Sequence, residues 1–250
     1  MKALITGASS GIGYSMAKYF DTLDIELILV GRNKEKLEQL QKELKVKSKI
    51  VIADLSDLTK VKDLYILTRS EEIDILINNA GFGLFGEFCE IDINKELEMI
   101  NTNIKAVHLL TKLFLRDMKK RNSGYIMNVA SSAAFGPGPL MSTYYATKAY
   151  VNNLTEAISE ELRRSNSNVS ISSLCPGPVD TNFNEVAGVK FKMKPLTSSY
   201  VAKYAIDKML QGKVVIVPGF TMKMALFLRR FAPRRLIRKI TYNIQKAKNS

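Results

Sequence analysis

A tyrosine and a lysine four residues apart, Tyr144 and Lys148, form the first pair in this 250-residue sequence with evident chemical capacity. On a helix, residues at this spacing share one face, so the phenol and the ammonium would be neighbours. At about 5 Å and an effective dielectric near 20, an ammonium stabilises a phenolate by roughly 3 kcal/mol, or about two pKa units. The pair therefore indicates a tyrosine that can give and take a proton near neutral pH.

A glycine-rich turn near the N-terminus indicates a phosphate cradle. Residues 6–13 read TGASSGIG and separate an apolar run from a helical pattern over residues 14–20. Glycines allow a tight turn there and let backbone N–H groups approach a pyrophosphate at the positive end of the following helix. The spacing differs from the G-x-G-x-x-G fingerprint, and taken alone such a turn can also bind nothing.

Short apolar runs alternate with longer charged segments of helical period. The expected strands are residues 3–5, 27–30, 50–53, 73–77, 125–129, 169–174 and 214–217. Strands that alternate with helices in this way predict a parallel sheet covered on both faces. No linker composition interrupts the series, so we expect one domain over residues 1–218 and a tail over residues 219–250.

The composition excludes several classes of protein. With 46% apolar residues the chain can bury a continuous core, which argues against disorder and against a disulfide-stapled scaffold. Cys89, Cys175 and His108 are too few for an ordinary zinc site, so we expect no metal and assign all three to packing. This usage favours a reduced, cytoplasmic setting. We also expect no signal peptide and no membrane span.

The formal charge of +13 is concentrated at one end of the chain. Residues 1–207 contain 26 Lys and Arg against 24 Asp and Glu, whereas residues 208–250 contain 11 against none. A nearly neutral body therefore carries a strongly cationic tail, and only the tail needs an anionic or packing partner to explain its charge.

Four motifs resemble those of the short-chain dehydrogenase/reductase family in order and spacing. They are TGASSGIG at 6–13, NNAG at 78–81, YYATK at 144–148 and PGPVDT at 176–181. The resemblance covers about residues 1–218. It implies a Rossmann-like, doubly wound, seven-stranded parallel sheet with helices on both faces, a bound nicotinamide dinucleotide, and hydride transfer between that cofactor and a carbonyl or alcohol carbon.

The resemblance also implies the catalytic roles. Tyr144 would be the acid/base, and Lys148 would lower its pKa and hold the ribose. Ser131, thirteen residues before Tyr144, would hydrogen-bond the substrate oxygen. Asn103, early in a helix that leads to Arg121, would hold a water in a proton relay.

Three of these four residues have a residue of the same type nearby that could take the same role. Ser132 is an equally available hydroxyl, and Asn101 competes with Asn103; spacing alone favours Ser131 and Asn103. Tyr145 has no lysine four residues further on, so we expect it to pack beside the site.

The family's motifs assign the cofactor contacts as well. The expected set is Gly7, Ser9, Ser10, Gly11, Ile12, Gly13, Arg32, Asp54, Leu55, Asn79, Ala80, Gly81, Tyr144, Lys148, Pro176, Gly177, Val179 and Thr181. An acid after the second strand would accept the 2′-hydroxyl of NAD and repel a 2′-phosphate. The chain has Arg32 there, whose guanidinium suits phosphate, so we expect NADP(H) rather than NAD(H). Solvated loop charges at Arg32 and Lys34 are the plainer alternative.

Apolar residues point to an apolar substrate of the ketone, hydroxysteroid or 3-oxoacyl type. Those expected to wall the pocket are Phe82, Leu84, Phe85, Phe135, Pro139, Leu140 and Met141. Residues 182–196 are expected to cover the substrate. Lys190, Lys192 and Lys194 in that segment form either a basic lip for an anionic substrate or a solvated edge.

These features together predict an NADP(H)-dependent oxidoreductase of the carbonyl reductase type, cytoplasmic and a homo-oligomer, either dimer or tetramer. The alternative is a non-catalytic, cofactor-sensing protein of the same fold that reaches a membrane or a partner through its tail. A degenerate member would be expected to lose Ser, Tyr or Lys, and this chain has all three.

The tail consists of two short basic amphipathic segments divided at Pro233. Three interpretations stay open: peripheral contact of residues 220–248 with a membrane surface, a helix that packs on this or a partner subunit, and a nucleic-acid-binding arm. Nucleic acid is the weakest of the three, because the sequence shows no recognised module and little aromatic interleaving.

Overall fold

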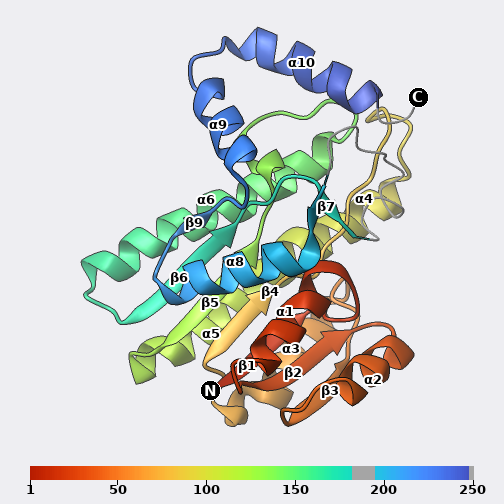
Figure 1. Ribbon diagram of the computed structural model, residues 1–250. Coiled ribbons are helices and arrows are strands. Elements are labelled where there is room, and N and C mark those ends of the chain that lie inside the picture. Colours follow the sequence, from red (N-terminus) through yellow and green to blue (C-terminus); the bar gives the residue numbers. More distant parts are fainter. Residues whose placement is uncertain (182–194, 248–250) are drawn as a thin grey trace.

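Seven parallel strands form one sheet through the middle of the computed structural model, which describes residues 1–181 and 195–247 (Figure 1). In chain order they are β1 (Lys2–Thr6), β2 (Glu26–Gly31), β3 (Ser48–Ile52), β4 (Ile75–Asn78), β5 (Gly124–Val129), β6 (Val169–Leu174) and β9 (Val215–Ile216). Across the sheet they follow the order β3-β2-β1-β4-β5-β6-β9. The chain thus builds outward from β1 to one edge and then from β4 to the other, which confirms the doubly wound sheet.

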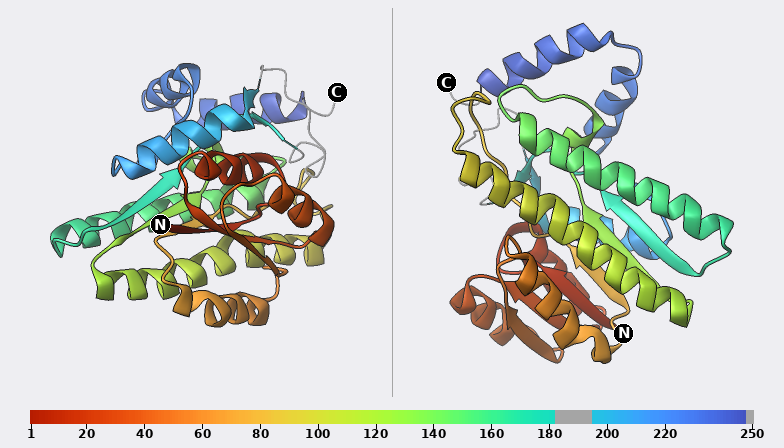
Figure 2. Two further views of the ribbon diagram at one scale, coloured as in Figure 1. Left: turned by 60° about the horizontal axis from the view of Figure 1, so that its bottom comes forward. Right: turned by 180° about the vertical axis from the view of Figure 1, so that it is seen from behind.

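Helices cover both faces of this sheet (Figure 2). On one face lie α1 (Gly11–Asp21), α2 (Lys34–Lys42) and α8 (Ser198–Leu210), and on the other lie α3 (Leu58–Thr68), α5 (Val107–Arg121) and α6 (Ser142–Arg164). Successive side chains of a strand point to opposite faces, so Ile5 and Leu4 belong to two different apolar clusters. Because both faces are buried, the strands appear in the sequence as continuous apolar runs.

The remaining elements lie between these strands and helices or follow the last strand. They are η1 (Arg69–Glu71), α4 (Ile93–Ile100), η2 (Asn101–Ala106), η3 (Ser132–Phe135), β7 (Val179–Asp180), β8 (Leu196–Thr197), α9 (Phe220–Arg229) and α10 (Arg234–Lys246). β7 and β8 form a separate two-stranded sheet. Within the described residues, no helix is long and apolar enough to cross a membrane.

Asn103 does not lie in a continuous α-helix, which corrects the expectation from the sequence. The structure joins α4 to α5 through η2, a π-helical turn that contains Asn103. A π turn widens the helix locally and re-aims the side chains on it, and such turns are frequent at functional sites.

The two cysteines and the single histidine differ in their surroundings. Cys175 is buried in an apolar cluster, as expected, and burial raises the pKa of its thiol to about 11. Cys89 is exposed, so its assignment to packing was wrong. His108 is half-buried, with its Nδ1 2.7 Å from the hydroxyl of Tyr150.

A buried polar network ties β4 and β5 to the helices behind them. Asn78 Nδ2 donates to Asn128 Oδ1 at 2.8 Å and to Thr111 Oγ1 at 3.0 Å, and Asn128 Nδ2 donates to Thr155 Oγ1 at 3.0 Å. All four side chains are buried. Groups that have lost water in this way are costly to leave without partners, so the network fixes α5 and α6 against the sheet.

Replacing Asn128 with alanine should lower the free energy of unfolding by about 2–4 kcal/mol, because it removes a hydrogen-bond partner of three buried side chains, Asn78, Thr111 and Thr155, and leaves a void. Urea denaturation measures this change. Asn153→Ala, at an exposed position of the same helix α6, is the matched control and should leave stability nearly unchanged. Equal midpoints for parent and Asn128→Ala would contradict the network's role.

Candidate active site

The four sequence motifs meet at the carboxyl edge of the sheet (Figure 1). Gly7 follows β1, Asn79 follows β4, and Pro176 lies just beyond β6. Lys148, from the motif on α6, donates to the carbonyl of Val129 at the end of β5, next to Ser131. Parallel strands end at the same edge, so segments far apart in the chain become neighbours there. The fold thus creates a site that no single stretch of sequence contains.

Tyr144, Ser131 and Lys148 form the centre of this site. Tyr144 and Lys148 are one turn apart on α6 and both are buried. The side chain of Ser131 hydrogen-bonds with the Tyr144 hydroxyl, and its Oγ also accepts the Ala133 N–H at 3.1 Å. This geometry favours Ser131 over Ser132 as the predicted substrate-binding hydroxyl.

The surroundings of Tyr144 change its acidity in the direction opposite to our expectation. Burial raises the pKa of Tyr144 well above its ordinary value, and the hydrogen bond with Ser131 offsets only part of that rise. The predicted lowering by Lys148 does not dominate in this structure. A buried phenol that stays protonated is suited to donate its proton, and it needs further positive charge nearby to give up that proton readily.

Lys148 is held by the backbone rather than by a carboxylate. Its Nζ donates to the carbonyl oxygen of Val129 at 2.8 Å and lies 5.9 Å from the centroid of the Tyr144 ring. Burial lowers the pKa of Lys148 to about 8. The ammonium is therefore still charged at neutral pH but titrates in an accessible range.

Asn103 fixes the other side of the site. Its Oδ1 accepts the Phe82 N–H at 3.1 Å, while its Nδ2 donates to the Phe82 carbonyl at 2.9 Å and to Thr147 Oγ1 at 3.1 Å. A Cβ on Gly81 would lie 2.8 Å from Asn103 Oδ1 and 3.4 Å from Lys148 Nζ. Asn103 thus holds residues 81 and 82 beside the lysine, whereas Asn101 makes no comparable contact among the described residues. Its predicted hold on a water stays a prediction.

The glycine-rich turn packs directly on the segment after β4. Gly7 has a φ of +65°, and a Cβ on Gly13 would lie 2.3 Å from the Gly7 carbonyl oxygen. Asn79 Nδ2 donates to the carbonyls of Thr6 and Gly7, each at 3.0 Å. Only glycine lets α1 begin this close to the strand edges, so the turn is built for close approach of backbone groups.

Thr6 organises this junction, and our sequence analysis did not identify it. Its buried Oγ1 accepts the N–H groups of Asn79 at 2.9 Å and Ala80 at 3.1 Å, and donates to the Ile77 carbonyl at 3.2 Å. The only sequence signal was its place between the first apolar run and Gly7. Its partners are more than 70 residues away, so that signal could not reveal its role.

The first turn of α1 fits a phosphate group. Within the described residues, the Ser10 side chain makes no capping hydrogen bond to the helix N-terminus, so the first N–H groups remain for a ligand. A Cβ on Gly11 would lie 3.0 Å from the Thr181 methyl, which places the last motif beside the first. The structure therefore brings the predicted pyrophosphate contacts together.

Arg32 lies directly after β2, mostly exposed, among acidic neighbours. Its Nη1 is 3.3 Å from Glu98 Oε1 and 3.9 Å from Asp54 Oδ2. Burial acts to raise the pKa of Asp54, but hydrogen bonds from Ser56 and the charge of Arg32 outweigh it and hold that pKa below its ordinary value. Exposed ion pairs of this kind are weak, so Arg32 remains available to another anion.

The remaining predicted cofactor residues also lie along this edge. Leu55 and Val179 are buried, and the Pro176 carbonyl accepts the Ser132 N–H at 2.8 Å. A Cβ on Gly31, at the end of β2, would lie 3.5 Å from Ser9 Oγ, which places Ser9 beside Arg32. Ile12 is half-buried against the core.

Apolar residues gather around Tyr144. Met99, Ala133 and Met141 pack with it, and the half-buried members of the cluster are Phe82, Leu84, Phe85 and Tyr145. An adjacent cavity of about 400 Å³ is lined by Gly136, Pro137, Gly138, Pro139, Ser142, Tyr145, Ala146 and Ala149. Phe135 packs in a neighbouring cluster instead. Residues 182–196 are the segment expected to cover the substrate. Its part from 182 to 194, which includes Lys190, Lys192 and Lys194, lies outside the described residues.

The C-terminal helices reach this side of the site. Gln245 of α10 is buried, and its Nε2 donates to the Tyr145 hydroxyl at 2.6 Å. Arg229 of α9 lies against Gly136, and Met222 lies against Gly177. Part of the tail therefore packs on the body of this chain, and Tyr145 is a packing neighbour that also bonds to the tail.

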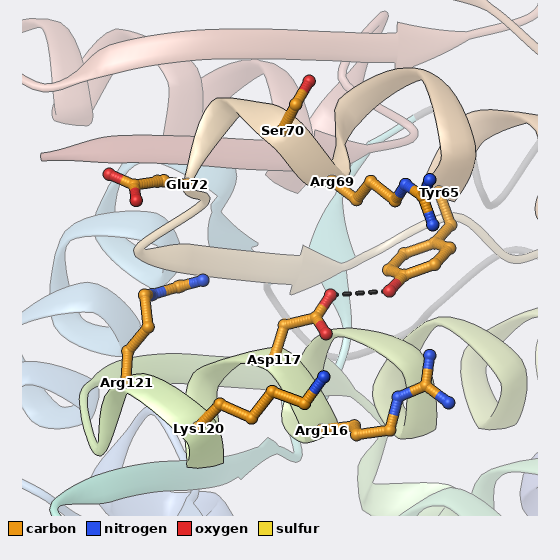
Figure 3. Close-up of a pocket in the computed structure, with 8 residues that line it drawn as sticks. All are labelled: Tyr65, Arg69, Ser70, Glu72, Arg116, Asp117, Lys120 and Arg121. Carbon is orange, nitrogen blue, oxygen red and sulfur yellow. Dashed lines mark hydrogen bonds between the residues drawn. The ribbon is translucent and has the colours of Figure 1, made fainter.

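A second cavity, of about 450 Å³, lies away from these residues (Figure 3). It is bounded by α3, η1 and the end of α5, next to the points where β4 and β5 begin. Tyr65 donates to Asp117 at 2.6 Å across it. Because it faces the amino ends of these strands, it is not the candidate active site. Among the described residues no cluster of His, Cys, Asp and Glu forms a metal site.

Comparisons with known proteins agree with this geometry. A family model described as short chain dehydrogenase matches residues 1–190. An uncharacterised oxidoreductase of Staphylococcus epidermidis is 32% identical over 224 residues, covering 88% of this chain and 96% of that protein. A very-long-chain 3-oxoacyl-CoA reductase of Anas platyrhynchos is 32% identical over 211 residues, covering 80% of this chain and 66% of that protein.

A solved structure shows the same fold with a cofactor bound. It is a short-chain dehydrogenase from Sphingobium yanoikuyae in complex with NADPH, with a TM-score of 0.82 and 28% sequence identity. The match covers 92% of this chain and 93% of that one.

Burial of the Lys148 ammonium gives the ligand-free protein a defined pH dependence. Lys148 has a pKa of about 8 when folded and the ordinary value of 10.5 when unfolded, so the unfolded chain binds more protons between these values. The contribution of Lys148 to the free energy of unfolding therefore rises with pH. The unfolding free energy of the parent relative to Lys148→Met should increase by about 2 kcal/mol between pH 7 and 9.5.

Urea denaturation at several pH values measures this difference. Lys112→Met, at an exposed position on α5, is the matched control and should show no such trend. A difference between parent and Lys148→Met that stays constant with pH would show that the ammonium is not buried as described.

Proposed function

Because the chain belongs to the short-chain dehydrogenase/reductase family, we propose that it is an NADP(H)-dependent oxidoreductase with Tyr144 as its acid/base. Membership makes it an oxidoreductase that uses a nicotinamide dinucleotide. The finer proposal is that it transfers a hydride between NADP(H) and the carbonyl or alcohol carbon of a fairly apolar substrate. One observation carries it: the buried Tyr144 and Lys148 come together with the half-buried Ser131 at the carboxyl edge of the sheet.

Tyr144, Ser131 and Lys148 each have a separate role in carbonyl reduction. When bound, the reduced cofactor supplies the hydride that forms the new C–H bond at the carbonyl carbon. Tyr144 breaks its O–H bond and gives the proton to the carbonyl oxygen, and its raised pKa keeps that proton in place until the oxygen becomes basic. Ser131 donates a hydrogen bond to the same oxygen. Lys148 stabilises the tyrosinate that remains.

The residues present suit the cofactor. The first turn of α1 offers N–H groups to the pyrophosphate, and Gly81 lies between Asn103 and Lys148, where a side chain would crowd the site. Arg32 supports the choice of NADP(H), since its guanidinium can leave the weak pairs with Glu98 and Asp54 for a doubly charged 2′-phosphate.

Arg32 should set the cofactor preference. The parent should bind NADPH at least about tenfold more tightly than NADH, and Arg32→Ala should shrink that ratio because the 2′-phosphate loses its cation. Fluorescence titration with each cofactor measures both constants. Arg164→Ala, which removes an exposed arginine paired with Glu160 on α6, is the matched control and should leave the ratio unchanged. Equal affinities in the parent would sink the assignment to NADP(H).

Substrate class is tested by a screen for NADPH oxidation with ketosteroids, aliphatic and aromatic ketones, and 3-oxoacyl thioesters. The apolar wall formed by Phe82, Leu84, Met99 and Met141 supports turnover of the bulky apolar members in preference to sugars. Tight NADPH binding without turnover of any compound would instead support the non-catalytic, cofactor-sensing alternative.

A further inference from the structure

The outward side of α9 is a continuous apolar stripe. It consists of Phe220 (76% exposed), Met224 (40%), Phe227 (51%) and Leu228 (60%), which share one helix face, and it continues with Phe231 (74%) in the turn just after α9. The rings of Phe227 and Phe231 pack edge to face with centroids 5.5 Å apart. Apolar side chains gathered on one exposed face in this way mark an interaction surface rather than scattered surface residues.

α10 continues this surface with a second stripe. Leu236, Ile240 and Ile244 are spaced four apart, so they share one face of the helix, and all three are exposed. The half-buried Ile237 and the buried Gln245 lie on the inner side, toward the body. We call these eight exposed residues, from α9, the turn after it and α10, the tail surface.

Little of either helix is buried by the rest of the chain. Among the described residues, α9 has no buried side chain and α10 has only Gln245. Helices of 10 and 13 residues are marginal in water unless an amphipathic face is packed. Among the described residues, therefore, nothing covers the tail surface in the way that helices of this length normally require.

Basic residues border the tail surface, and no acidic residue occurs after position 207. Exposed cations beside it include Arg230, Arg234, Arg235, Arg238 and Lys239. Within the described part of the chain, no carboxylate lies within ion-pair distance of these five. An apolar face bordered by cations is the arrangement by which a helix lies in the interface of an anionic bilayer, with its apolar side among the acyl chains.

We propose that the tail surface docks this protein on anionic lipid bilayers. A second copy of the chain fits it less well, because a two-fold interface would bring the same cation-rich patch against itself with no acid in the tail to compensate. The inner sides of the same helices contact Gly136, Tyr145 and Gly177, so docking places the 400 Å³ cavity beside the bilayer. The docking itself does not rest on the proposed function.

A single tryptophan reports docking directly, because the sequence contains none. Phe227→Trp in the full chain should shift its emission to shorter wavelength with vesicles of phosphatidylglycerol and phosphatidylcholine, but not with phosphatidylcholine alone. High salt should suppress the shift. Ile66→Trp is the matched control: Ile66 is exposed on α3, which lies at the bottom of both views in Figure 2, far from α10 at the top. It should show no shift.

Vesicle flotation tests the same surface without a probe. The double variant Leu228→Ser and Phe231→Ser should reduce the fraction that floats with anionic vesicles at least tenfold, while Ile66→Ser with Leu67→Ser should float like the parent. All four positions are exposed, so the variants should fold. Neither assay needs cofactor or substrate, so failure here leaves the proposed enzyme untouched.

Two results would overturn the proposal. A parent chain that does not float with anionic vesicles, and a Phe227→Trp emission that does not move, would remove the lipid partner. A parent that sediments as a dimer without vesicles, and becomes a monomer only in the Leu228→Ser and Phe231→Ser variant, would assign the tail surface to a second copy of the chain instead.

Discussion

The buried ammonium of Lys148 is the interaction on which the rest of the site depends. A charge taken out of water is costly, and here the hydrogen bond that offsets the cost comes from the Val129 carbonyl at the end of β5. That bond joins α6 to the central strand edge and so fixes Tyr144, one turn earlier on the same helix, beside Ser131. One contact therefore links the chemistry of the site to the packing of α6, beside the buried amide network that also holds this helix.

The same edge of the sheet gathers the cofactor contacts. Thr6 ends β1 and binds the segment after β4, so the glycine-rich turn cannot move without moving Asn79. The π-helical turn η2 directs Asn103 toward Phe82. The hydrogen bonds between these two residues hold Gly81 and Phe82 beside Lys148. Behind the edge, the buried amide network holds the strands in register with their helices. Cofactor cradle and proton donor are thus parts of one rigid arrangement.

The sequence was sufficient to predict the sheet and its strands, and to single out Tyr144, Ser131 and Lys148, which the structure brings together, because strand runs, helix spacing and family motifs are local signals. It could not yield the direction of the Tyr144 pKa, since burial outweighs the nearby lysine only once α6 is packed. It also missed the carbonyl partner of Lys148, the role of Thr6 and the bond from Gln245 to Tyr145. These contacts join residues 19, 74 and 100 positions apart, and no local pattern encodes such pairs.

The most direct test of Tyr144 as the proton donor is the single-turnover rate of NADPH oxidation by a ketone, measured for the parent and for Tyr144→Phe. Removing one hydroxyl deletes the donor and leaves the cofactor cradle intact. The rate should fall by about 100- to 10 000-fold, with the NADPH dissociation constant nearly unchanged. A Tyr144→Phe enzyme that turns over like the parent would show that another group supplies the proton.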